Sequence, residues 1–242
     1  MNLMYNYGNR ITKKEHLMLF IKFGQKEHIE QLQKEGLIYM NTFDYFRECE
    51  DKEIGDSNEN INYLFQADKS EVMIDNYKLT KENGLINLTI NAPFMNNPFL
   101  THGFCISCIS KGDEIREDFK IFDDKVTDFG DTLLIIYNQK IFIERIEKAL
   151  REIFEKNLAE YWQGNKVEYI DFNTYQGEIG PFRKSLLYKH QQEWRLGVRA
   201  KNHNHPFIFK IGSIEDISKI QSVEKFKNQI KENEKGHFNI YF

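Results

Sequence analysis

The chain has 242 residues, of which 40% are hydrophobic, so it is long enough to bury a substantial core, and we expect a single domain over residues 1–242. A formal net charge of −4 gives no overall attraction to nucleic acid or an anionic membrane, although a local basic surface would not show in that sum. We do not expect a secreted protein, because the chain has only three cysteines and shows no leader before Leu17. We do not expect a membrane protein, because no apolar run approaches the roughly 20 residues that cross a bilayer. We therefore expect a cytoplasmic protein.

The first part of the chain predicts a strand, a helix and a second strand. Residues 17–23 are apolar on both alternating faces except at Lys22, as in a buried central strand that carries one charge. Residues 26–35 have apolar positions three apart and end before Gly36, which is typical of a short helix with a glycine C-cap. A strand over 37–40 completes this unit.

A helical turn and an acidic loop are expected next. Asn41 can cap a turn over residues 42–47, because its side chain can accept from the first free amides. The acidic loop over 50–59 lacks the spacing of an EF-hand, so we interpret it as a solvated run of charge. Arg47 could pair with a carboxylate of this loop or with a phosphate group, and we favour the internal pair.

The remaining elements predict an α+β protein. Phenylalanine and tyrosine are abundant, with 20 and 12 residues, whereas proline occurs only 4 times, which favours strands of aromatic and β-branched residues. Strands are expected at residues 71–75, 85–91, 103–110, 131–138, 167–172, 207–211 and 237–242. Helices are expected at 140–158, where apolar residues recur at three and four, and at 224–235.

The most informative segment is Gln191-Gln192-Glu193-Trp194-Arg195. If residues 191–199 form a strand, its side chains alternate, with Gln191, Glu193, Arg195 and Arg199 on one face and apolar side chains on the other. The polar face could be a solvated sheet surface or the floor of a polar cleft. The pattern alone favours the solvated surface.

Cysteine and histidine pairs give weaker signals. Cys105 and Cys108 have the spacing of a metal or redox pair, but residues three apart on a strand point to opposite faces and cannot share one ion. His203 and His205 are interpreted as solvated residues of a turn. A nucleophilic cysteine needs a positioned base, and the sequence does not show one.

A metal-dependent nuclease is an alternative in which Glu193 and Asp171 supply carboxylates. Such sites usually take a lysine where Arg195 stands, and arginine does not readily lose its proton to act as a base. We therefore rank this alternative below the one that follows.

Three separated pieces, taken in order, resemble the ADP-ribosyltransferase superfamily: the strand with Lys22 and Phe23, the segment 104–107, and Gln191-Gln192-Glu193. Members of the superfamily carry Arg or His on the first strand, a Ser or Tyr element in the middle, and a Glu often preceded two residues earlier by Gln or Glu. The stretch 184–196 also resembles a bacterial family of unassigned function. It is similar, more loosely, to the messenger-RNA-modifying ADP-ribosyltransferase toxin of a phage-defence toxin, antitoxin and chaperone system.

The resemblance implies an α+β fold with a split central sheet and flanking helices, NAD as co-substrate, and transfer of ADP-ribose to RNA or protein. By the same resemblance, Glu193 would hydrogen-bond the ribose 2′-hydroxyl, Gln191 would orient the attacking group, and an antitoxin would be a partner. The chemistry suits a carboxylate, because cleavage of the nicotinamide glycosidic bond builds positive charge on the ribose.

Six residues are expected to contact NAD on the basis of the resemblance: Lys22, Phe23, Tyr39, Tyr45, Arg47 and Ser107. Lys22 stands where Arg or His is usual, and Ser107 alone represents the serine element. A structural lysine is an equal alternative for Lys22. This departure also keeps open a catalytically silent module that binds a ligand or partner in the same groove. An RNA acceptor would require a local basic, aromatic surface, for example near Lys184, Tyr188, Lys189 and Arg199.

Overall fold

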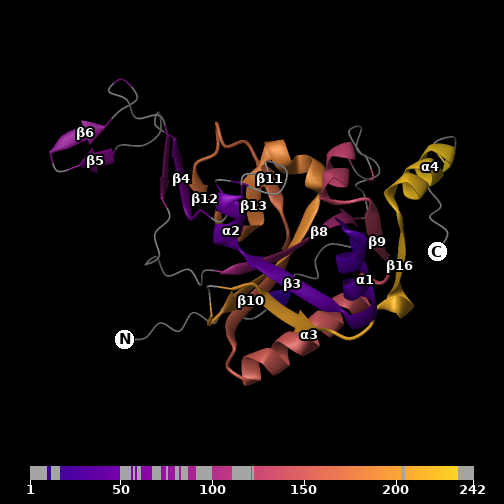
Figure 1. Cartoon of the computed structure of the whole chain (residues 1–242). Helices are drawn as coiled ribbons and strands as arrows, with labels where there is room; N and C mark the ends of the chain where they lie inside the picture. Colours follow the sequence, from indigo (N-terminus) through magenta and orange to yellow (C-terminus); the bar gives the residue numbers. More distant parts are fainter. Residues whose placement is uncertain are drawn as a thin grey trace.

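The computed structural model describes residues 10–11, 17–49, 56, 58, 61–66, 72–74, 76–79, 82, 87–90, 100–110, 121, 123–202 and 205–233. These residues form a mixed α+β protein with a large, mainly antiparallel sheet and a few helices (Figure 1). In the part of the chain that is described, no helix is both long and apolar enough to span a membrane.

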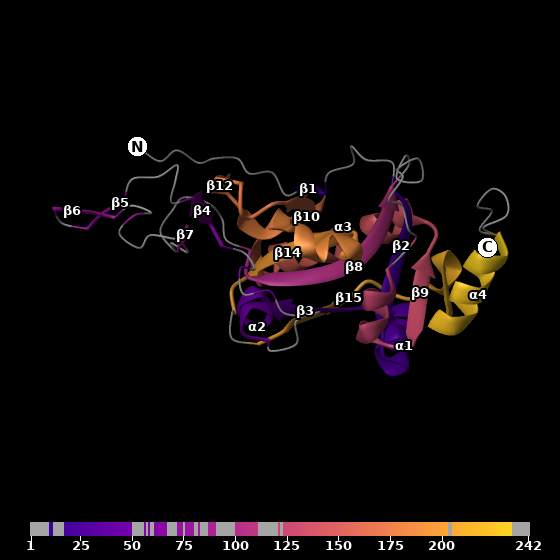
Figure 2. The same cartoon turned by 90° about the horizontal axis from the view of Figure 1, so that it is seen from above.

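The central sheet has nine strands, ordered β1-β10-β14-β8-β2-β9-β16, with β3 and β15 attached beside this path. In chain order they are β1 (Arg10–Ile11), β2 (Leu17–Gly24), β3 (Leu37–Thr42), β8 (His102–Ser110), β9 (Thr132–Ile136), β10 (Ala159–Lys166), β14 (Glu193–Ala200), β15 (Phe207–Lys210) and β16 (Ser218–Ser222). Figure 2 shows β14, β8 and β2 side by side in this order. Among the described strands of this central sheet, only β1 and β10 pair in parallel.

The sheet divides along one edge of β8. Near the end of β8, Ser107 pairs with Ile21 of β2, whereas near its start Gly103 pairs with Asn41 of β3. Within the described strands, residues 104–106 have no ladder partner on this edge. A buried backbone carbonyl in such a gap needs another donor.

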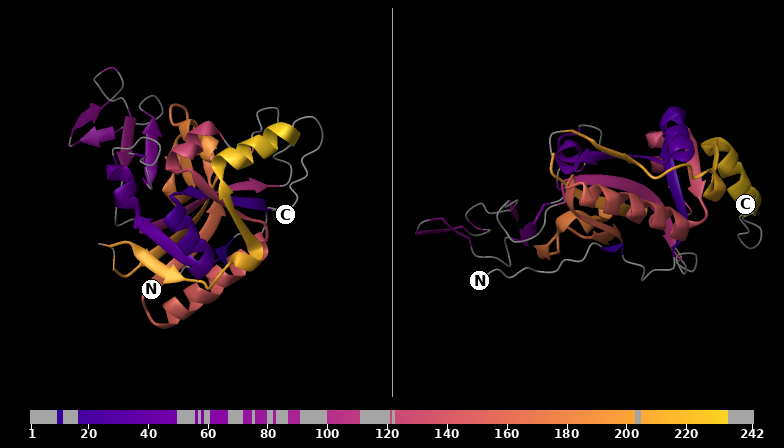
Figure 3. Two further views of the ribbon diagram at one scale, coloured as in Figure 1. Left: turned by 45° about the vertical axis from the view of Figure 1, so that its right-hand side comes forward. Right: turned by 90° about the horizontal axis from the view of Figure 1, so that it is seen from below.

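The two faces of the sheet are covered by different elements. Helices α1 (Lys26–Glu35) and α3 (Gln139–Glu155) bury their apolar stripes with β3 against one face, in a cluster that includes Phe20 and Trp194. Figure 3 shows α3 along this face. The 3-10 turn η3 (Asp124–Phe129) and helix α4 (Val223–Asn233) cover the other face near β2 and β9.

Smaller elements gather beyond the ends of β8 and β14. A short helix, α2 (Phe43–Glu48), follows β3, and a two-stranded parallel sheet joins β11 (Glu168–Ile170) to β13 (Arg183–Ser185). The other elements are β4 (Tyr63–Gln66), β5 (Val72–Ile74), β6 (Tyr77–Leu79), β7 (Asn87–Ile90), β12 (Gly177–Glu178), η4 (Gly180–Phe182), η5 (Leu186–Gln191) and η6 (Glu215–Ile217). The β5–β6 hairpin stands at the end of the molecule opposite α4 (Figures 1 and 2).

Most of the predicted elements are confirmed. Helix α1 has the predicted bounds, and Gly36 ends it in the left-handed conformation with φ of 62°. The strands predicted at 17–23, 37–40, 103–110 and 131–138 correspond to β2, β3, β8 and β9. The helix predicted at 140–158 begins one residue earlier and ends at Glu155.

Three predictions need correction or completion. Thr42, not Asn41, caps α2: its hydroxyl accepts the Tyr45 backbone N–H at 3.0 Å, while Asn41 still pairs in β3. Strands β1, β10 and β16 of the central sheet were not predicted. The sequences of β10 and β16 mix polar and apolar residues without a clear alternation, and β10 also contains Gly164. The expected terminal strand over 237–242, His203, and nearly all of the acidic loop lie outside the described residues.

Candidate functional site

The Gln191-Gln192-Glu193 segment is not one continuous strand. Gln191 ends η5, Gln192 has a left-handed backbone with φ of 45°, and β14 begins only at Glu193. The prediction of a strand from residue 191 is therefore wrong at its start. Strand pleating cannot place Gln191 and Glu193 on a common face, because the chain turns between them.

The polar face of β14 is buried. Glu193 is 3% exposed and Arg195 1% exposed, so the prediction of a solvated surface is wrong for these two residues. One reason is that β14 is an inner strand of the sheet, between β10 and β8. A second reason is that α2 and η4 lie against Arg195 and contact it through Phe43 and Pro181. Trp194 lies in the core on the other face, as predicted. Of the predicted polar positions on β14, Arg199 is part-exposed and pairs with Glu160.

Two cations hold the carboxylate of Glu193. Arg195 Nε donates to Glu193 Oε1 at 2.7 Å, and Lys184 Nζ lies 3.4 Å from Glu193 Oε2. Arg195 also donates from Nη1 to the Pro181 carbonyl oxygen at 2.5 Å, and its guanidinium carbon lies 5.3 Å from the centre of the Phe43 ring. A fully buried carboxylate is thus paired within an ionic cluster that links β14, β13, η4 and α2.

Lys184 also connects Glu193 to Gln191. Its Nζ donates to Gln191 Oε1 at 2.9 Å and lies 4.7 Å from the centre of the Tyr188 ring. Because an ammonium group only donates, the amide oxygen of Gln191 must face Lys184 and the amide nitrogen must turn away from it. The Ser107 hydroxyl donates to the Gln191 carbonyl oxygen at 2.8 Å, which fixes the backbone at the same point.

The surroundings keep Glu193 ionised. Burial by itself raises the pKa of this carboxyl, but the charges of Arg195 and Lys184, with hydrogen bonds from Arg195 and Cys105, outweigh burial and lower the pKa to about 2. Glu193 is therefore a carboxylate at neutral pH. An anion in this position can stabilise positive charge that develops on a bound molecule.

Cys105 and Tyr169 stay protonated beside this carboxylate. Burial, together with the charge of Glu193, raises the pKa of the Cys105 thiol to about 12, so it is not an activated nucleophile. Burial and the same charge hold the pKa of Tyr169 well above its usual range. Cys105 lies beside Glu193 whereas Cys108 lies in the core, which confirms that the two cysteines point to opposite faces.

Lys22 lies at the division of the sheet. The Lys22 Nζ donates to the Cys105 carbonyl oxygen at 2.8 Å. Cys105 lies in the part of β8 that has no described strand partner on this edge. The same Nζ lies 5.3 Å from the centre of the Phe104 ring. Ile21, Ser107 and Glu193 are opposite one another in register, so their side chains share one face of the sheet. Because side chains alternate along a strand, the Lys22 side chain leaves β2 on the opposite face. Burial lowers the pKa of Lys22, against the attraction of Glu193. The contact accounts for a charged side chain on this strand.

The other predicted NAD contacts do not converge on Glu193. Phe23 is 6% exposed and packs in the core beneath η3 and α4. Tyr39 is half-exposed on β3, opposite Ile208 of β15. Tyr45 is half-exposed on α2, and Arg47 of the same helix forms an ion pair with Asp44. Helix α2 nevertheless reaches the ionic cluster through Phe43.

No protein-family model matches this chain, and no curated protein or solved structure is significantly similar to it. The functional hypotheses therefore depend on which residues are present and on how the fold arranges them.

The described residues contain no group of three or more His, Cys, Asp or Glu side chains that could hold a metal ion. Asp171, the second carboxylate of the nuclease alternative, accepts the Asn173 backbone N–H at 2.9 Å and the Thr174 hydroxyl at 3.3 Å in a local turn. This turn gives Asp171 a structural role.

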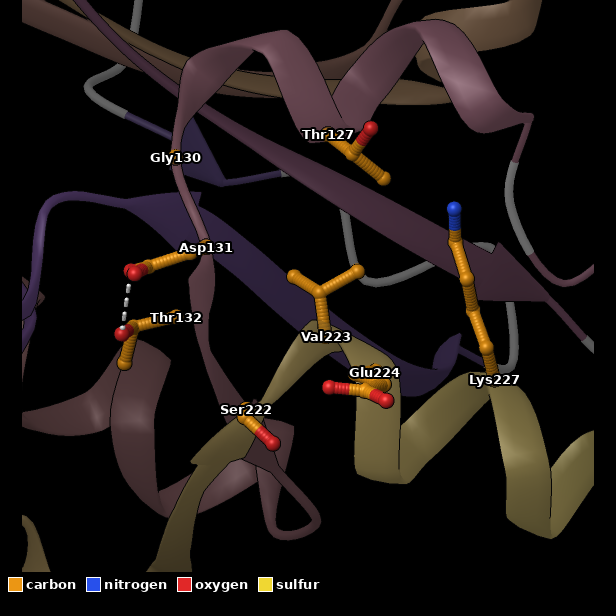
Figure 4. A pocket seen from close by; sticks show the side chains of 8 residues that line it. All are labelled: Thr127, Gly130, Asp131, Thr132, Ser222, Val223, Glu224 and Lys227. Carbon is orange, nitrogen blue, oxygen red and sulfur yellow. Dashed lines mark hydrogen bonds between the residues drawn. The ribbon is translucent and has the colours of Figure 1, made fainter.

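A separate pocket lies between η3, the start of β9 and the start of α4 (Figure 4). It is lined by Thr127, Gly130, Asp131, Thr132, Ser222, Val223, Glu224 and Lys227. The Thr132 hydroxyl donates to the Asp131 carboxylate at 2.9 Å, and Lys227 pairs with Asp124 at 2.7 Å. None of the predicted site residues lines this pocket, so it is separate from the Glu193 cluster.

Proposed function

We propose that the protein is an NAD-dependent ADP-ribosyltransferase that acts on a macromolecule, with an ADP-ribosyltransferase-like fold. The observation that carries this proposal is the adjacency of β14, β8 and β2, which bear Glu193, Ser107 and Lys22. These residues represent the three elements of the resemblance. They lie on neighbouring strands although Lys22 and Glu193 are 171 positions apart in the sequence.

In the proposed reaction, Glu193 stabilises the positive charge that develops on the nicotinamide ribose. A nucleophilic atom of the acceptor attacks C1′, the bond from C1′ to the nicotinamide nitrogen breaks, and neutral nicotinamide leaves with the electron pair. The acceptor's proton passes to solvent. The low pKa of Glu193, about 2, supports this role, because the carboxylate is already ionised at neutral pH.

NAD binding is proposed to use residues next to this cluster. Lys22 at the division of the sheet and Ser107 on β8 are the nearest of the predicted contacts. Of the two candidate aromatic residues, we favour Tyr45 over Tyr39, because α2 contacts Arg195 through Phe43. Arg47 on the same helix is a candidate for a phosphate oxygen, since a guanidinium group pairs well with phosphate.

The proposed setting is the bacterial cytoplasm, where the protein would act as a toxin or phage-defence effector held in check by an antitoxin. We favour RNA as the acceptor because of the resemblance. Exposed Lys189 lies on η5 between Lys184 and Glu193 in the chain, and partly exposed Arg199 lies further along β14, so accessible cations occur on both sides of Glu193 in the sequence. Contacts to phosphate groups need such side chains.

One observation favours a second candidate, a catalytically silent module of the same fold. Both carboxylate oxygens of Glu193 already contact a cation, Oε1 through Arg195 and Oε2 through Lys184, and the residue is 3% exposed. In this alternative the cluster stabilises the fold and NAD or a partner binds without reaction.

Labelled NAD and cell lysate separate the two candidates. Wild-type protein should transfer label to a macromolecule, and Glu193→Gln should lose most of this transfer, because it keeps the size of the side chain but removes its charge. Glu160→Gln is the matched control, since it makes the same change at an exposed carboxylate on the neighbouring strand β10. Equal transfer by wild type and Glu193→Gln would remove the catalytic assignment.

Digestion of the labelled product identifies the acceptor class. Label released by nuclease would support RNA, whereas label released by protease would indicate a protein acceptor. Metal-dependent cleavage of unlabelled nucleic acid, without label transfer, would instead support the nuclease alternative. NAD binding without transfer, measured by calorimetry, would support the silent module.

A further inference from the structure

The pairing of Gln191 with Glu193 depends on a third residue. The left-handed backbone of Gln192 breaks the strand, so the local chain does not align the two side chains. Lys184 touches both instead, with Nζ 2.9 Å from Gln191 Oε1 and 3.4 Å from Glu193 Oε2. Its side chain is almost completely buried, and it comes from a different strand.

The parallel pair of β11 and β13 delivers Lys184 to this position. Lys184 on β13 is directly opposite Tyr169 on β11, and the Tyr169 hydroxyl accepts the backbone N–H of Glu193 at 2.8 Å. Two neighbouring residues of this small sheet therefore hold Glu193, one through its side chain and the other through its backbone. Since two strands support the contact, Lys184 has little freedom to leave it.

We propose that Lys184 is a positioning residue for the reaction: it fixes the Gln191 amide and the Glu193 carboxylate in one relative geometry. This inference rests on the proposed function. Lys184 donates to both groups at once, so it sets the direction of the Gln191 amide as well as the place of the Glu193 charge. A positioning role of this kind affects the chemical step more than the binding of NAD.

Kinetics of NAD cleavage by the full chain test the role. Lys184→Met keeps the length of the side chain but removes its charge and donors, and it should lower kcat about ten- to a hundredfold with a much smaller change in KM. Lys184→Arg, whose fork can still donate to two oxygens, should recover most of the lost rate. Lys210→Met is the control, because Lys210 pairs with Glu35 at the surface, outside the cluster. Equal loss in Lys184→Met and Lys184→Arg would overturn the proposal.

A carbon-13 titration of the Glu193 carboxyl gives a readout that does not depend on catalysis. In the described residues, Arg195, Lys184, Cys105 and Tyr169 lie around Glu193, and Lys22 interacts with its charge from the other face of the sheet. The carboxyl should titrate at higher pH in Lys184→Met than in the wild type, and an unchanged titration would overturn the proposal.

The same titration separates failure of this inference from failure of the proposed function. If the wild-type protein cleaves no NAD, the proposed function fails, whereas the titration still decides whether Lys184 acts on Glu193. If Lys184→Met does not fold, the wild-type titration still tests whether the cations hold the carboxylate. A midpoint near the ordinary value of 4.5 in the folded wild-type protein would show that neither Arg195 nor Lys184 holds the carboxylate, and this result would overturn the positioning role.

Discussion

Tyr169 accepts the backbone N–H of Glu193 at the first residue of β14, with 2.8 Å between its hydroxyl oxygen and the amide nitrogen. The carbonyl oxygen of Glu193 accepts the backbone N–H of Val167 at 2.9 Å. Both backbone groups of Glu193 are thus held by the chain that runs from β10 into β11. The start of β14 is fixed by this contact as well as by the ladder with β8.

Tyr169→Phe should therefore destabilise the protein. The change leaves the Glu193 N–H without its hydroxyl partner, which should lower the free energy of unfolding by roughly 1–3 kcal/mol in a denaturant titration. Tyr175→Phe is the control: the Tyr175 hydroxyl donates to the exposed Glu178 carbonyl, which water can satisfy, so its effect should stay within about 0.5 kcal/mol. Equal losses in the two variants would contradict a special role for Tyr169.

Arg195 and Arg199 offer a test on a single strand. Arg195→Met removes one cation from a buried ion pair, and the free energy of unfolding should fall by roughly 3–5 kcal/mol. Arg199→Met breaks an ion pair in which both side chains are more than a third exposed, and the expected change is within about 0.5 kcal/mol. Thermal and denaturant unfolding of the two variants measure the difference. A similar cost for both would mean that water screens the Glu193 cluster.

The low pKa of Glu193 predicts a contribution to stability that depends on pH. A folded-state pKa of about 2, compared with an ordinary 4.5, means that the contribution is complete above about pH 5 and is lost as pH falls towards 2. The depression corresponds to roughly 3 kcal/mol at neutral pH. The difference in free energy of unfolding between wild type and Glu193→Gln, measured by denaturant titration at each pH, should shrink by about this amount on acidification. A difference that stays constant with pH would show that the carboxyl is not held in this way.

Two glycines in the left-handed region differ in the space around them. Gly36, which ends α1, has φ of 62°, and an added Cβ would lie 2.1 Å from the carbonyl oxygen of Gly212. Gly212 has φ of 81°, but an added Cβ would meet nothing within 4 Å. Gly212→Ala should cost about 1–2 kcal/mol from backbone strain alone, and Gly36→Ala should cost clearly more. Denaturant titration compares them, and an equal cost would mean that the α1 end moves freely to admit a methyl group.

Local patterns identified the elements that bury one continuous apolar side. Helix α1 and strand β2 have such patterns, and Gly36 marks the helix end through its own conformational freedom, so neighbouring residues were sufficient. Strands β10 and β16 were missed because polar residues, and in β10 also Gly164, interrupt their alternation. Their pairing partners, far away in sequence, determine that they are strands.

The candidate site was predicted in part. The sequence singled out Glu193, Gln191 and the residue types suited to charge stabilisation, but it gave Lys184 no role beside the carboxylate and did not mention Tyr169. No short spacing connects these residues to Glu193: Lys184 is nine positions away and Tyr169 is 24 positions away in the chain. Only the parallel pairing of β11 with β13 brings them together.

Short-range sequence patterns were sufficient to predict the α+β composition, the apolar face of β14 and the identity of its carboxylate, because each follows from side chains a few residues apart. Tertiary structure decided that the opposite face of β14 is buried, that the strand starts at Glu193 after a left-handed Gln192, and that Lys184 joins Gln191 to Glu193. The physical reason is that burial and ion pairing depend on which surfaces meet across the sheet, and strand alternation along one segment cannot specify its partners.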